Sequence, residues 1–510
     1  MDSSYGNPLR TLWYLWIKLR RFSRGPGKRK FYIGLLVAVY VIVSLLVWNY
    51  HSVNRYKRKL SVLKKRFLHY CNPVGPPLGN EHNEPMEYAQ FKLKQVQVVA
   101  RHGDRSSVVN DFPGLMRFNC ELSSQNFQHA KKLAMLKKIE RFLKTVYVNG
   151  RNEVVTDFKL SGRKICRPGQ LTGKGYLQHI LLGEYMLNMY GRRLDINIAS
   201  IEEEEILVSA TPIKRTQQSA AGFLAGMLEK VFKDIPGNKS EEYPTVKIRV
   251  SPDELGYFRE DESNEIPSCS ELERIIKEQR DSREFRNRIA TFEPLLLKIS
   301  QIFNISTVKL PALTRIFDMV ATRYCHHYPP PCGRGGCINN DVNLELLKAV
   351  DWIIKTKYTA SATLATHPLL SKIAQRMLTH SRGEGHTKFV LYATHDSTVA
   401  PLLIEMGIFQ NRWPPYASRI VFELWEAGGL LGSKLTGPEV DRHFIRVLYD
   451  GRDFTRKLKF CKDKLKFGKL CPLKAFVRAL EGSSESMDVE YSRLCRKTTV
   501  RNLKNYLSRV

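Results

Sequence analysis

Three short stretches of the chain place histidine, arginine and aspartate where they could transfer a phosphoryl group. The first is RHGDR, residues 101–105, directly after a run of apolar residues. The neutral imidazole of His102 would be a competent nucleophile towards phosphorus, and Arg101 and Arg105 could bind the phosphoryl oxygens through paired hydrogen bonds. Gly103 would let the backbone approach the substrate closely. A histidine in a surface ion pair is the simpler alternative, and the apolar run before it counts against that alternative.

The other two stretches could supply a third arginine and an acid. In ATPIKRTQQSA, residues 210–220, Pro212 stands where a helix could begin. Arg215 would then lie in the first turn, where backbone N–H groups favour anions. In ATHDS, residues 393–397, His395 could bind phosphoryl oxygens, and Asp396 could protonate a departing alkoxide if its surroundings raised its pKa. Each stretch alone is a weak signal, because helix starts with an exposed arginine and His-Asp dipeptides are common.

Short apolar runs precede all three stretches and predict strands of a buried sheet. They are residues 91–100, 206–210 and 389–393, and the first of them alternates before it becomes continuously apolar. In open α/β sheets, ligands bind beyond the carboxyl ends of the strands. We therefore expect an α/β fold in which the three stretches meet in one crevice, with helices such as residues 272–288 and 343–358 around it.

Together, the three stretches resemble the histidine acid phosphatases, the branch of the histidine phosphatase superfamily marked by an RHGxR motif and a later HD pair. The matching residues are Arg101, His102, Gly103 and Arg105 in the first motif, His395 and Asp396 in the second, and Arg215 at the family's third phosphate-binding arginine. Ser106 and Ser107 stand where the family usually has a proline.

This resemblance implies a histidine-phosphatase-like α/β core with an inserted, mostly helical cap, which we expect near residues 110–166 and 251–340. It also implies two-step hydrolysis of a phosphomonoester with no metal and no other cofactor. His102 would form the phosphohistidine, Asp396 would donate the proton, and the three arginines and His395 would hold the phosphate.

A closer similarity, to type II membrane members of this family that act in the Golgi on phosphorylated xylose, spans about residues 91–495. It rests on stretches beyond the active-site motifs, such as residues 166–175, 418–425 (SRIVFELW) and 446–451. It implies a phosphorylated saccharide of the proteoglycan linkage region as substrate, and glycosaminoglycan-synthesising enzymes as candidate partners.

Two other functions are compatible with the same motifs. A general luminal or lysosomal acid phosphatase, or an inositol-polyphosphate phosphatase, would share all six active-site residues and differ only in the pocket. An inactive polyanion-binding membrane protein is the third reading. Such a protein is expected to have lost at least one of the six residues, and none is missing.

Residues 31–50 (FYIGLLVAVYVIVSLLVWNY) carry no charge. Twenty helical residues rise about 30 Å, which matches the hydrocarbon thickness of a bilayer. A core helix would keep a polar stripe, and a cleaved signal peptide would have a shorter apolar run followed by a cleavage site. We therefore predict a retained signal-anchor, with residues 1–30 as a cytoplasmic tail, 51–85 as a luminal stem and 86–510 as the catalytic domain.

The cysteines indicate the orientation in the membrane more clearly than the charges do. Basic residues flank residues 31–50 on both sides in similar number, so the positive-inside rule does not decide which end is cytoplasmic. All ten cysteines follow the apolar segment: Cys71, Cys120, Cys166, Cys269, Cys325, Cys332, Cys337, Cys461, Cys471 and Cys495. Their even number suits five disulfides in an oxidising compartment. Glycosylation sequons at Asn238 and Asn304 lie on the same side. We expect a single-pass type II protein with its catalytic domain in the lumen, in the Golgi if the resemblance holds.

Histidines 326 and 327 next to Cys325 permit a zinc site. The spacing from Cys325 to Cys332 and Cys337 is not the paired spacing typical of zinc, and three prolines interrupt the segment. The sequence therefore favours a loop stapled by disulfides over a metal site.

The formal net charge of +31 is unevenly distributed. Residues 1–66 hold 15 Lys and Arg against one acidic residue, so +14 of the charge flanks the apolar segment. No zinc-finger spacing, ribonucleoprotein motif or basic-zipper pattern accompanies the charge, so nucleic-acid binding is not expected. The remaining basic surface would suit an acidic saccharide.

Overall fold

The computed structural model describes residues 26–76, 90–109, 117–122, 127–149, 152–160, 164–196, 205–233, 245–250, 269–435, 437–467, 469–481 and 495. The chain divides into two units, Met1–Lys65 and Arg66–Val510. The predicted cytoplasmic tail lies outside the described residues as far as residue 25, and so does the sequon asparagine Asn238.

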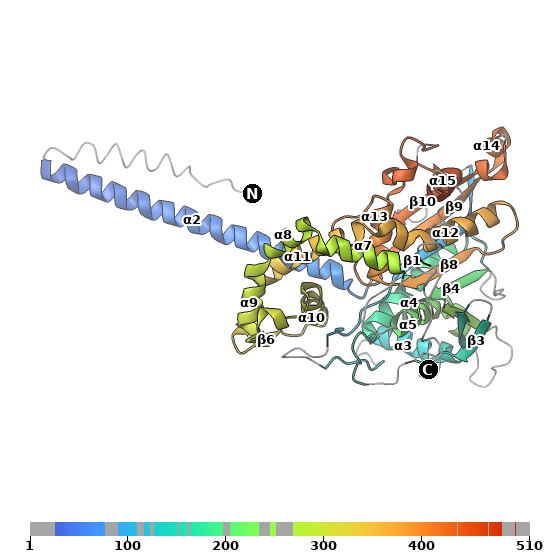
Figure 1. The fold of residues 1–510 in the computed structure, drawn as a ribbon, viewed down its shortest axis with the longest axis horizontal. Helices are drawn as coiled ribbons and strands as arrows, with labels where there is room; N and C mark the ends of the chain where they lie inside the picture. The colour runs from blue at the N-terminus through green and yellow to red at the C-terminus, as the bar shows by residue number, and fades with distance from the viewer. Residues whose placement is uncertain are drawn as a thin grey trace. The chain divides into compact units, whose positions relative to one another are not determined.

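Helix α2, Pro26–Cys71, is unbroken over 46 residues and carries the apolar segment (Figure 1). Among the described residues it is the one helix long and apolar enough to cross a membrane. Large apolar side chains along it, such as Tyr40 and Trp48, are more than two-thirds exposed, which is compatible with membrane anchoring. The predicted stem, residues 51–85, is helical from its start to Cys71. Its last helical turn, from residue 66, belongs to the second unit.

A mixed sheet organises the second unit, with strand order β11-β10-β9-β1-β8-β4-β5-β2-β3 and β12 paired to β10. The strands are β1 (Phe91–Arg101), β2 (Leu143–Asn149), β3 (Asn152–Asp157), β4 (Ile206–Ala210), β5 (Val246–Val250), β8 (Phe389–Thr394), β9 (Arg419–Ala427), β10 (His443–Tyr449), β11 (Arg452–Asp453) and β12 (Cys471–Pro472). The predicted strands are β1, β4 and β8. They are neighbours, and β8 pairs in parallel with both of the others, which confirms the expected α/β core.

Helices cover both faces of the sheet because alternate residues of its central strands are apolar and point to opposite sides. Val98 of β1 packs in one buried cluster with Phe223, whereas Val99 packs in another with Leu369. Figure 1 shows the two helical layers on either side of the strands. The first layer contains α3 (Phe127–Ile139), α4 (Gly173–Tyr190), α5 (Lys214–Met227) and α6 (Glu229–Lys233), and the second contains α12 (Ala362–Ser381), α13 (Asp396–Glu405) and α15 (Leu473–Glu481). The short helix α14 (Gly429–Lys434) follows β9.

The cap consists of five helices between β5 and α12, drawn in green to orange in Figure 1. They are α7 (Ser270–Asp281), α8 (Arg283–Ala290), α9 (Glu293–Phe303), α10 (Leu313–Cys325) and α11 (Asn340–Thr359), with a short hairpin of β6 (Cys332–Gly333) and β7 (Gly336–Cys337) before α11. The expected cap segment 251–340 is thus helical over most of its described part. The other expected cap segment, 110–166, differs, because its residues 143–149 and 152–157 extend the sheet. Leu143 to Tyr147 pair in parallel with β5, and β3 pairs with β2.

Five disulfides pair all ten cysteines and confirm the number expected from the sequence. They are Cys71–Cys325, Cys120–Cys166, Cys269–Cys495, Cys332–Cys337 and Cys461–Cys471. The segment considered as a possible zinc site holds a hairpin stapled by Cys332–Cys337, and its first cysteine, Cys325, is bonded to Cys71, which confirms the disulfide-stapled loop that the sequence favoured. Asn304 ends α9 in a left-handed conformation and is exposed.

Candidate active site

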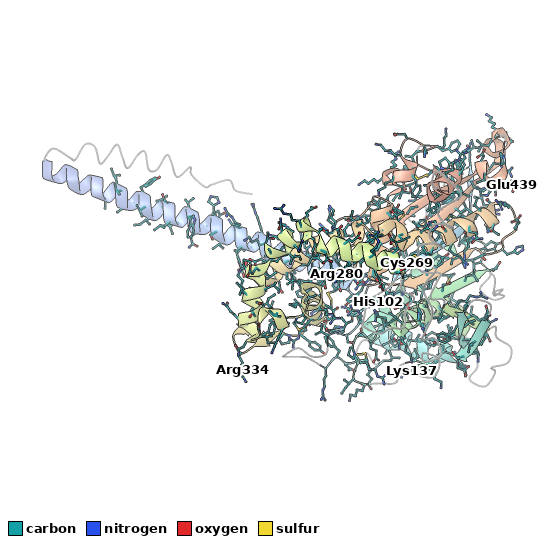
Figure 2. All side chains as sticks on the ribbon, viewed as in Figure 1. His102, Lys137, Cys269, Arg280, Arg334 and Glu439 are labelled. Carbon is teal, nitrogen blue, oxygen red and sulfur yellow. A yellow bond between two sulfur atoms is a disulfide. The ribbon has the colours of Figure 1, made fainter. Side chains whose placement is uncertain are left out.

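The three motif stretches meet at the carboxyl ends of β1, β8 and β4. His102 follows β1, His395 caps α13 directly after β8, and Arg215 lies in the first turn of α5 after β4. The rings of His102 and His395 are 5.5 Å apart between centroids. All six predicted residues (Arg101, His102, Arg105, Arg215, His395 and Asp396) are buried, and Figure 2 shows His102 near the centre of the unit.

His102 is held in the form that a nucleophile needs. Its Nδ1 lies 2.8 Å from the carbonyl oxygen of Gly103, and because a carbonyl only accepts, Nδ1 carries the proton. Nε2 therefore carries the lone pair, and it has no hydrogen-bond partner among the described residues. Burial lowers the pKa of His102 well below its usual value, and the charges of Arg215 and Arg101 lower it further. The imidazole is thus neutral, with a free lone pair.

Two arginines flank His102, each with a buried donor atom left over. Arg101 donates from Nη1 to the Pro414 carbonyl oxygen at 2.6 Å, and its Nη2 lies 2.7 Å from an Asp396 oxygen. Arg105 pairs through Nη1 with Asp318 at 2.7 Å. Within the described part of the chain, neither Nε has an acceptor. Buried donors without acceptors are costly, so these two atoms favour the binding of an anion.

Asp396 is the first residue of α13 and is bonded on both carboxylate oxygens. Oδ1 accepts from the backbone N–H of Ser397 at 2.8 Å, and Oδ2 accepts from Trp413 Nε1 at 2.7 Å and from Arg101. Burial raises the pKa of Asp396, but the charges of Arg101 and Arg105 and the bond from Trp413 outweigh burial and lower it. The raised pKa that the sequence interpretation required is therefore not present in this structure.

His395 is neutral, and both of its ring nitrogens are hydrogen-bonded. Its Nε2 lies 2.9 Å from Thr211 Oγ1, and its Nδ1 lies 3.4 Å from Arg215 Nη2. Because arginine only donates, Nδ1 is the acceptor, and Nε2 donates to Thr211. Burial, followed by the charge of Arg215, lowers the pKa of His395 well below its usual value. In this structure His395 therefore orients Arg215, and its contact with phosphoryl oxygens stays a prediction.

Asp318 is a residue of the candidate site that the sequence interpretation missed. It lies on α10 and is 4% exposed. Besides its ion pair with Arg105, it accepts from the Ser107 hydroxyl at 3.0 Å and from the Val108 backbone N–H at 2.9 Å. One cap carboxylate thus fixes both the arginine and the loop in which serines replace the usual proline. No motif surrounds Asp318 in the sequence, more than 200 residues from its partners.

Gly103 and Asp104 hold the motif loop against α4. A Cβ atom at Gly103 would lie 2.3 Å from the Gly175 carbonyl oxygen, so this glycine is required for packing against α4. Its expected role in substrate approach stays a prediction. The buried carboxylate of Asp104 bonds the Thr172 hydroxyl at 2.7 Å and His326 Nε2 at 2.6 Å. His326, considered above as a zinc ligand, is therefore a structural partner of the loop.

A cavity of about 780 Å³ lies beside Asp396 and Arg105 and is walled by the cap helices. Its lining is largely apolar and aromatic, and it includes Ile276, Phe285, Ile289, Leu313, Ile353, Tyr358 and Trp413. Lys357 and Arg280 add positive charge. Burial lowers the pKa of Lys357, with Asp396 raising it and Arg280 lowering it. Of the six predicted residues, Arg105 and Asp396 line this cavity.

Comparison with known proteins identifies a family for this site. Residues 92–321 and 345–450 match the model of the histidine phosphatase superfamily (branch 2). The chain is 28% identical to 2-phosphoxylose phosphatase 1 of Xenopus tropicalis, covering 80% of this chain and 77% of that protein. It is 26% identical to the Homo sapiens protein of the same name, covering 81% of each. Among solved structures, the multiple inositol polyphosphate phosphatase of Bifidobacterium longum, bound to inositol hexasulfate, is 12% identical, with a TM-score of 0.48, and the match covers 81% of this chain and 97% of that one.

Proposed function

Because the chain belongs to the histidine phosphatase superfamily (branch 2), we propose that it hydrolyses phosphomonoesters through a phosphohistidine at His102, and that its substrate is 2-phosphoxylose in the proteoglycan linkage region. One observation carries the chemistry: among the described residues, Nε2 of neutral His102 has no partner, and it lies in a buried site with two arginine Nε donors that have no acceptor there. The relatives named 2-phosphoxylose phosphatase 1 support the substrate.

The proposed reaction has two steps. His102 Nε2 attacks phosphorus, the bond from phosphorus to the sugar oxygen breaks, and Asp396 gives its proton to that oxygen. A water molecule then attacks the phosphohistidine, Asp396 takes the proton from the water, and inorganic phosphate leaves with His102 restored. Arg101, Arg105 and Arg215 would bind the phosphoryl oxygens throughout and neutralise their charge, and His395 would hold Arg215 or turn to the phosphate.

The substrate itself would help to protonate Asp396. In this structure the charges of Arg101 and Arg105 hold the pKa of Asp396 down. A phosphoryl dianion bound to the same arginines offsets their charge and adds a negative charge nearby, and both effects raise that pKa. The acid form required for the first step is therefore favoured by binding.

We expect Asp396→Asn to slow hydrolysis of a sugar phosphate by about 100-fold or more, within the usual range for a general acid. Hydrolysis of nitrophenyl phosphate should fall much less, because its leaving group needs no proton. The wild-type kcat/KM should be bell-shaped, because activity is lost when Asp396 loses its proton and when His102 gains one. The variant should lose the fall on the alkaline side. Equal losses on both substrates would contradict the acid role.

The substrate is tested with the full chain in detergent, beside its His102→Ala variant as a blank. Phosphate release is compared for a phosphoxylose-containing linkage oligosaccharide, inositol hexakisphosphate and nitrophenyl phosphate. A strong preference for the oligosaccharide is expected. Equal or better activity on the other two compounds would support phosphatase activity but reject phosphoxylose as the substrate. The protein would then be a general acid phosphatase or an inositol-polyphosphate phosphatase. No activity on any of them would favour a binding protein.

The cavity offers a matched pair of variants for the same assay. Ile276 on α7 lines the cavity, whereas its neighbour Lys277 is exposed. Ile276→Trp should raise KM for the oligosaccharide and leave nitrophenyl phosphate hydrolysis unchanged, and Lys277→Trp should affect neither. If both variants behave alike, the saccharide does not occupy this cavity.

The proposed location is the Golgi membrane, with the catalytic domain in the lumen. The apolar part of α2 supports anchoring, and the five disulfides support an oxidising compartment. Asn304 is exposed and free of helix packing, as a glycosylated asparagine has to be. Glycosaminoglycan-synthesising enzymes remain proposed partners on the basis of the substrate alone.

A further inference from the structure

The last turn of α2 is built into the catalytic unit. That unit begins at residue 66, and Phe67, Tyr70 and Cys71 are only 1%, 4% and 3% exposed. Phe67 stacks on two aromatic rings of α10. Asn72, with a φ of 45°, ends the helix. This turn lies outside the region of the family match, which begins at residue 92, so the match gives it no role.

Tyr70 contacts Arg101 directly. Its hydroxyl accepts from Arg101 Nη2 at 3.3 Å, and its ring centroid lies 5.2 Å from the guanidinium carbon. The ring of Tyr416 lies 4.4 Å from the same carbon, and both rings attract the cation. With Pro414 and Asp396 holding the two terminal nitrogens, these contacts determine where the unpartnered Nε of Arg101 points.

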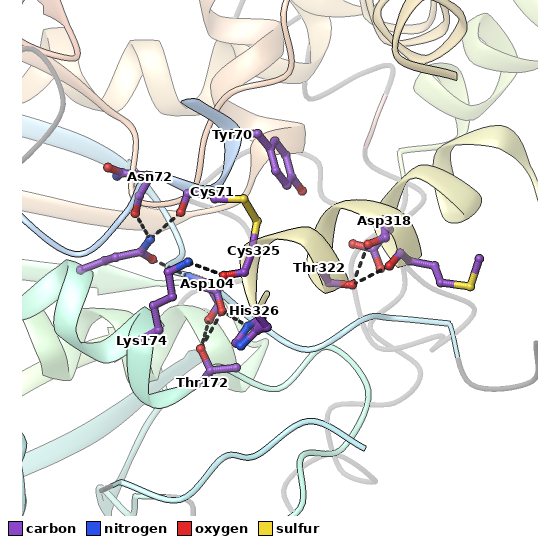
Figure 3. Close-up of a disulfide and its surroundings, with 12 residues drawn as sticks. Tyr70, Cys71, Asn72, Asp104, Thr172, Lys174, Asp318, Thr322, Cys325 and His326 are labelled. Atoms are coloured by element: carbon purple, nitrogen blue, oxygen red, sulfur yellow. Dashed lines mark hydrogen bonds and ion pairs between the residues drawn. A yellow bond between two sulfur atoms is a disulfide. The ribbon is translucent and has the colours of Figure 1, made fainter. Parts of the chain in front are cut away.

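The backbone around Tyr70 is clamped to the motif loop and to the cap. Cys71 is joined to Cys325 by a disulfide, as Figure 3 shows. The side-chain N–H groups of Gln178 donate to the carbonyl oxygens of Cys71 at 2.9 Å and Asn72 at 2.5 Å. The oxygen of the same Gln178 accepts from the backbone N–H of Asp104 at 2.7 Å. The helix end and the motif loop therefore share one glutamine.

On the cap side, the Cys71–Cys325 disulfide joins the helix end to α10, the helix that holds Arg105. Cys325 is the last residue of α10, which also carries Asp318, the partner of Arg105. The next residue, His326, bonds Asp104. Figure 3 shows His326 and Asp104 beside the disulfide, and Asp318 further along α10. We propose that Tyr70 is a positioning residue for Arg101 in the active site, and that the Cys71–Cys325 disulfide keeps Tyr70 in place.

If Tyr70 positions Arg101, loss of the Tyr70 ring should also change the pKa of Asp396, which loss of a merely structural residue would not do. The largest influences on this pKa, besides burial, are Arg101, Arg105, Trp413 and His395, and the charge of Lys357 also acts on it. Tyr70 contacts two of them, Arg101 and the Trp413 ring at 6.2 Å between centroids. Loss of the Tyr70 ring should let both move away from the carboxylate. Because both lower the pKa of Asp396, that pKa should then rise.

The test compares three variants of the full chain with nitrophenyl phosphate as substrate. Tyr70→Leu should lower kcat/KM by about 10- to 100-fold, as expected for a misplaced binding group, and weaken inhibition by inorganic phosphate. The pH above which kcat/KM falls should be higher for this variant than for the wild type. Tyr70→Phe keeps the ring and should retain most of the activity. Phe67→Leu removes an equally buried ring of the same turn that does not touch Arg101, and it should leave phosphate inhibition and the pH profile unchanged.

The proposal is overturned if Tyr70→Leu and Phe67→Leu lose activity alike, or if Tyr70→Leu leaves phosphate inhibition and the pH profile as in the wild type. Thermal unfolding of each variant separates loss of folded protein from loss of positioning. Nitrophenyl phosphate reports any phosphatase acting through His102, so the result is independent of whether phosphoxylose is the natural substrate.

Discussion

His102→Ala should abolish phosphatase activity, with a loss of roughly 10⁴-fold or more in kcat, as is usual when a covalent nucleophile is removed. The variant keeps the arginines that bind phosphate, so inorganic phosphate should still bind. The measurement is turnover of nitrophenyl phosphate, together with trapping of labelled phosphate on the protein during turnover. Wild-type protein should carry label that survives base and is released by acid, as a phosphohistidine does, and the variant should carry none.

A matched control is His443→Ala. His443 is also buried, and its Nδ1 lies 2.8 Å from the carbonyl oxygen of Glu439. It belongs to β10 and lies outside the active-site motifs. This variant tests whether loss of a buried, hydrogen-bonded histidine is enough to inactivate the enzyme. Label trapped on the His102→Ala variant, or turnover within a few-fold of wild type, would place the nucleophile elsewhere.

Truncation before residue 90 should strongly lower the activity of the catalytic unit, whereas truncation before residue 66 should not. A secreted fragment 66–510 keeps the last turn of α2 and its disulfide. A fragment 90–510 loses the buried side chains of Phe67 and Tyr70, each contributing roughly 1.5–3 kcal/mol, and a disulfide that typically contributes about 2–5 kcal/mol. Because whole domains are stable by only about 5–15 kcal/mol, the shorter fragment should be strongly destabilised and at least tenfold less active.

Both fragments are assayed with nitrophenyl phosphate and by thermal unfolding, beside the full chain. The Cys332→Ser/Cys337→Ser variant of fragment 66–510 is the control, because it removes a disulfide that staples only the β6–β7 hairpin. It should remain active. If fragment 90–510 matches the longer fragment in activity and melting temperature, the helix end is dispensable.

The sequence predicted the central strands and the gathering of the six site residues because these depend on local patterns. Apolar runs such as residues 389–393 predict buried strands, and the carboxyl ends of parallel strands lie at one edge of a sheet. Residues 143–157 were assigned to the cap because their pairing with β5 is a long-range contact. An alternating stretch such as this one fits an edge strand equally well.

The residues that the sequence could not reveal act from a distance. Asp318 and Tyr70 are separated by 213 and 31 residues from the arginines that they hold, and neither lies in a motif. The lowered pKa of Asp396 likewise depends on Arg101, almost 300 residues away. The proline-rich run after Cys71 made residues 51–85 look like a stem, yet burial of Phe67 and Tyr70 depends on partners in α10 that no local pattern indicates.

Two disulfides join the cap to other parts of the unit. Cys269, next to the start of α7, is bonded to Cys495 and packs beside Ala365 of α12. Cys325, at the end of α10, is bonded to Cys71 at the end of α2. Both links restrain movement of the cap, so we expect discrimination among phosphomonoesters to depend more on the size and shape of the cavity than on closure of the cap about the substrate.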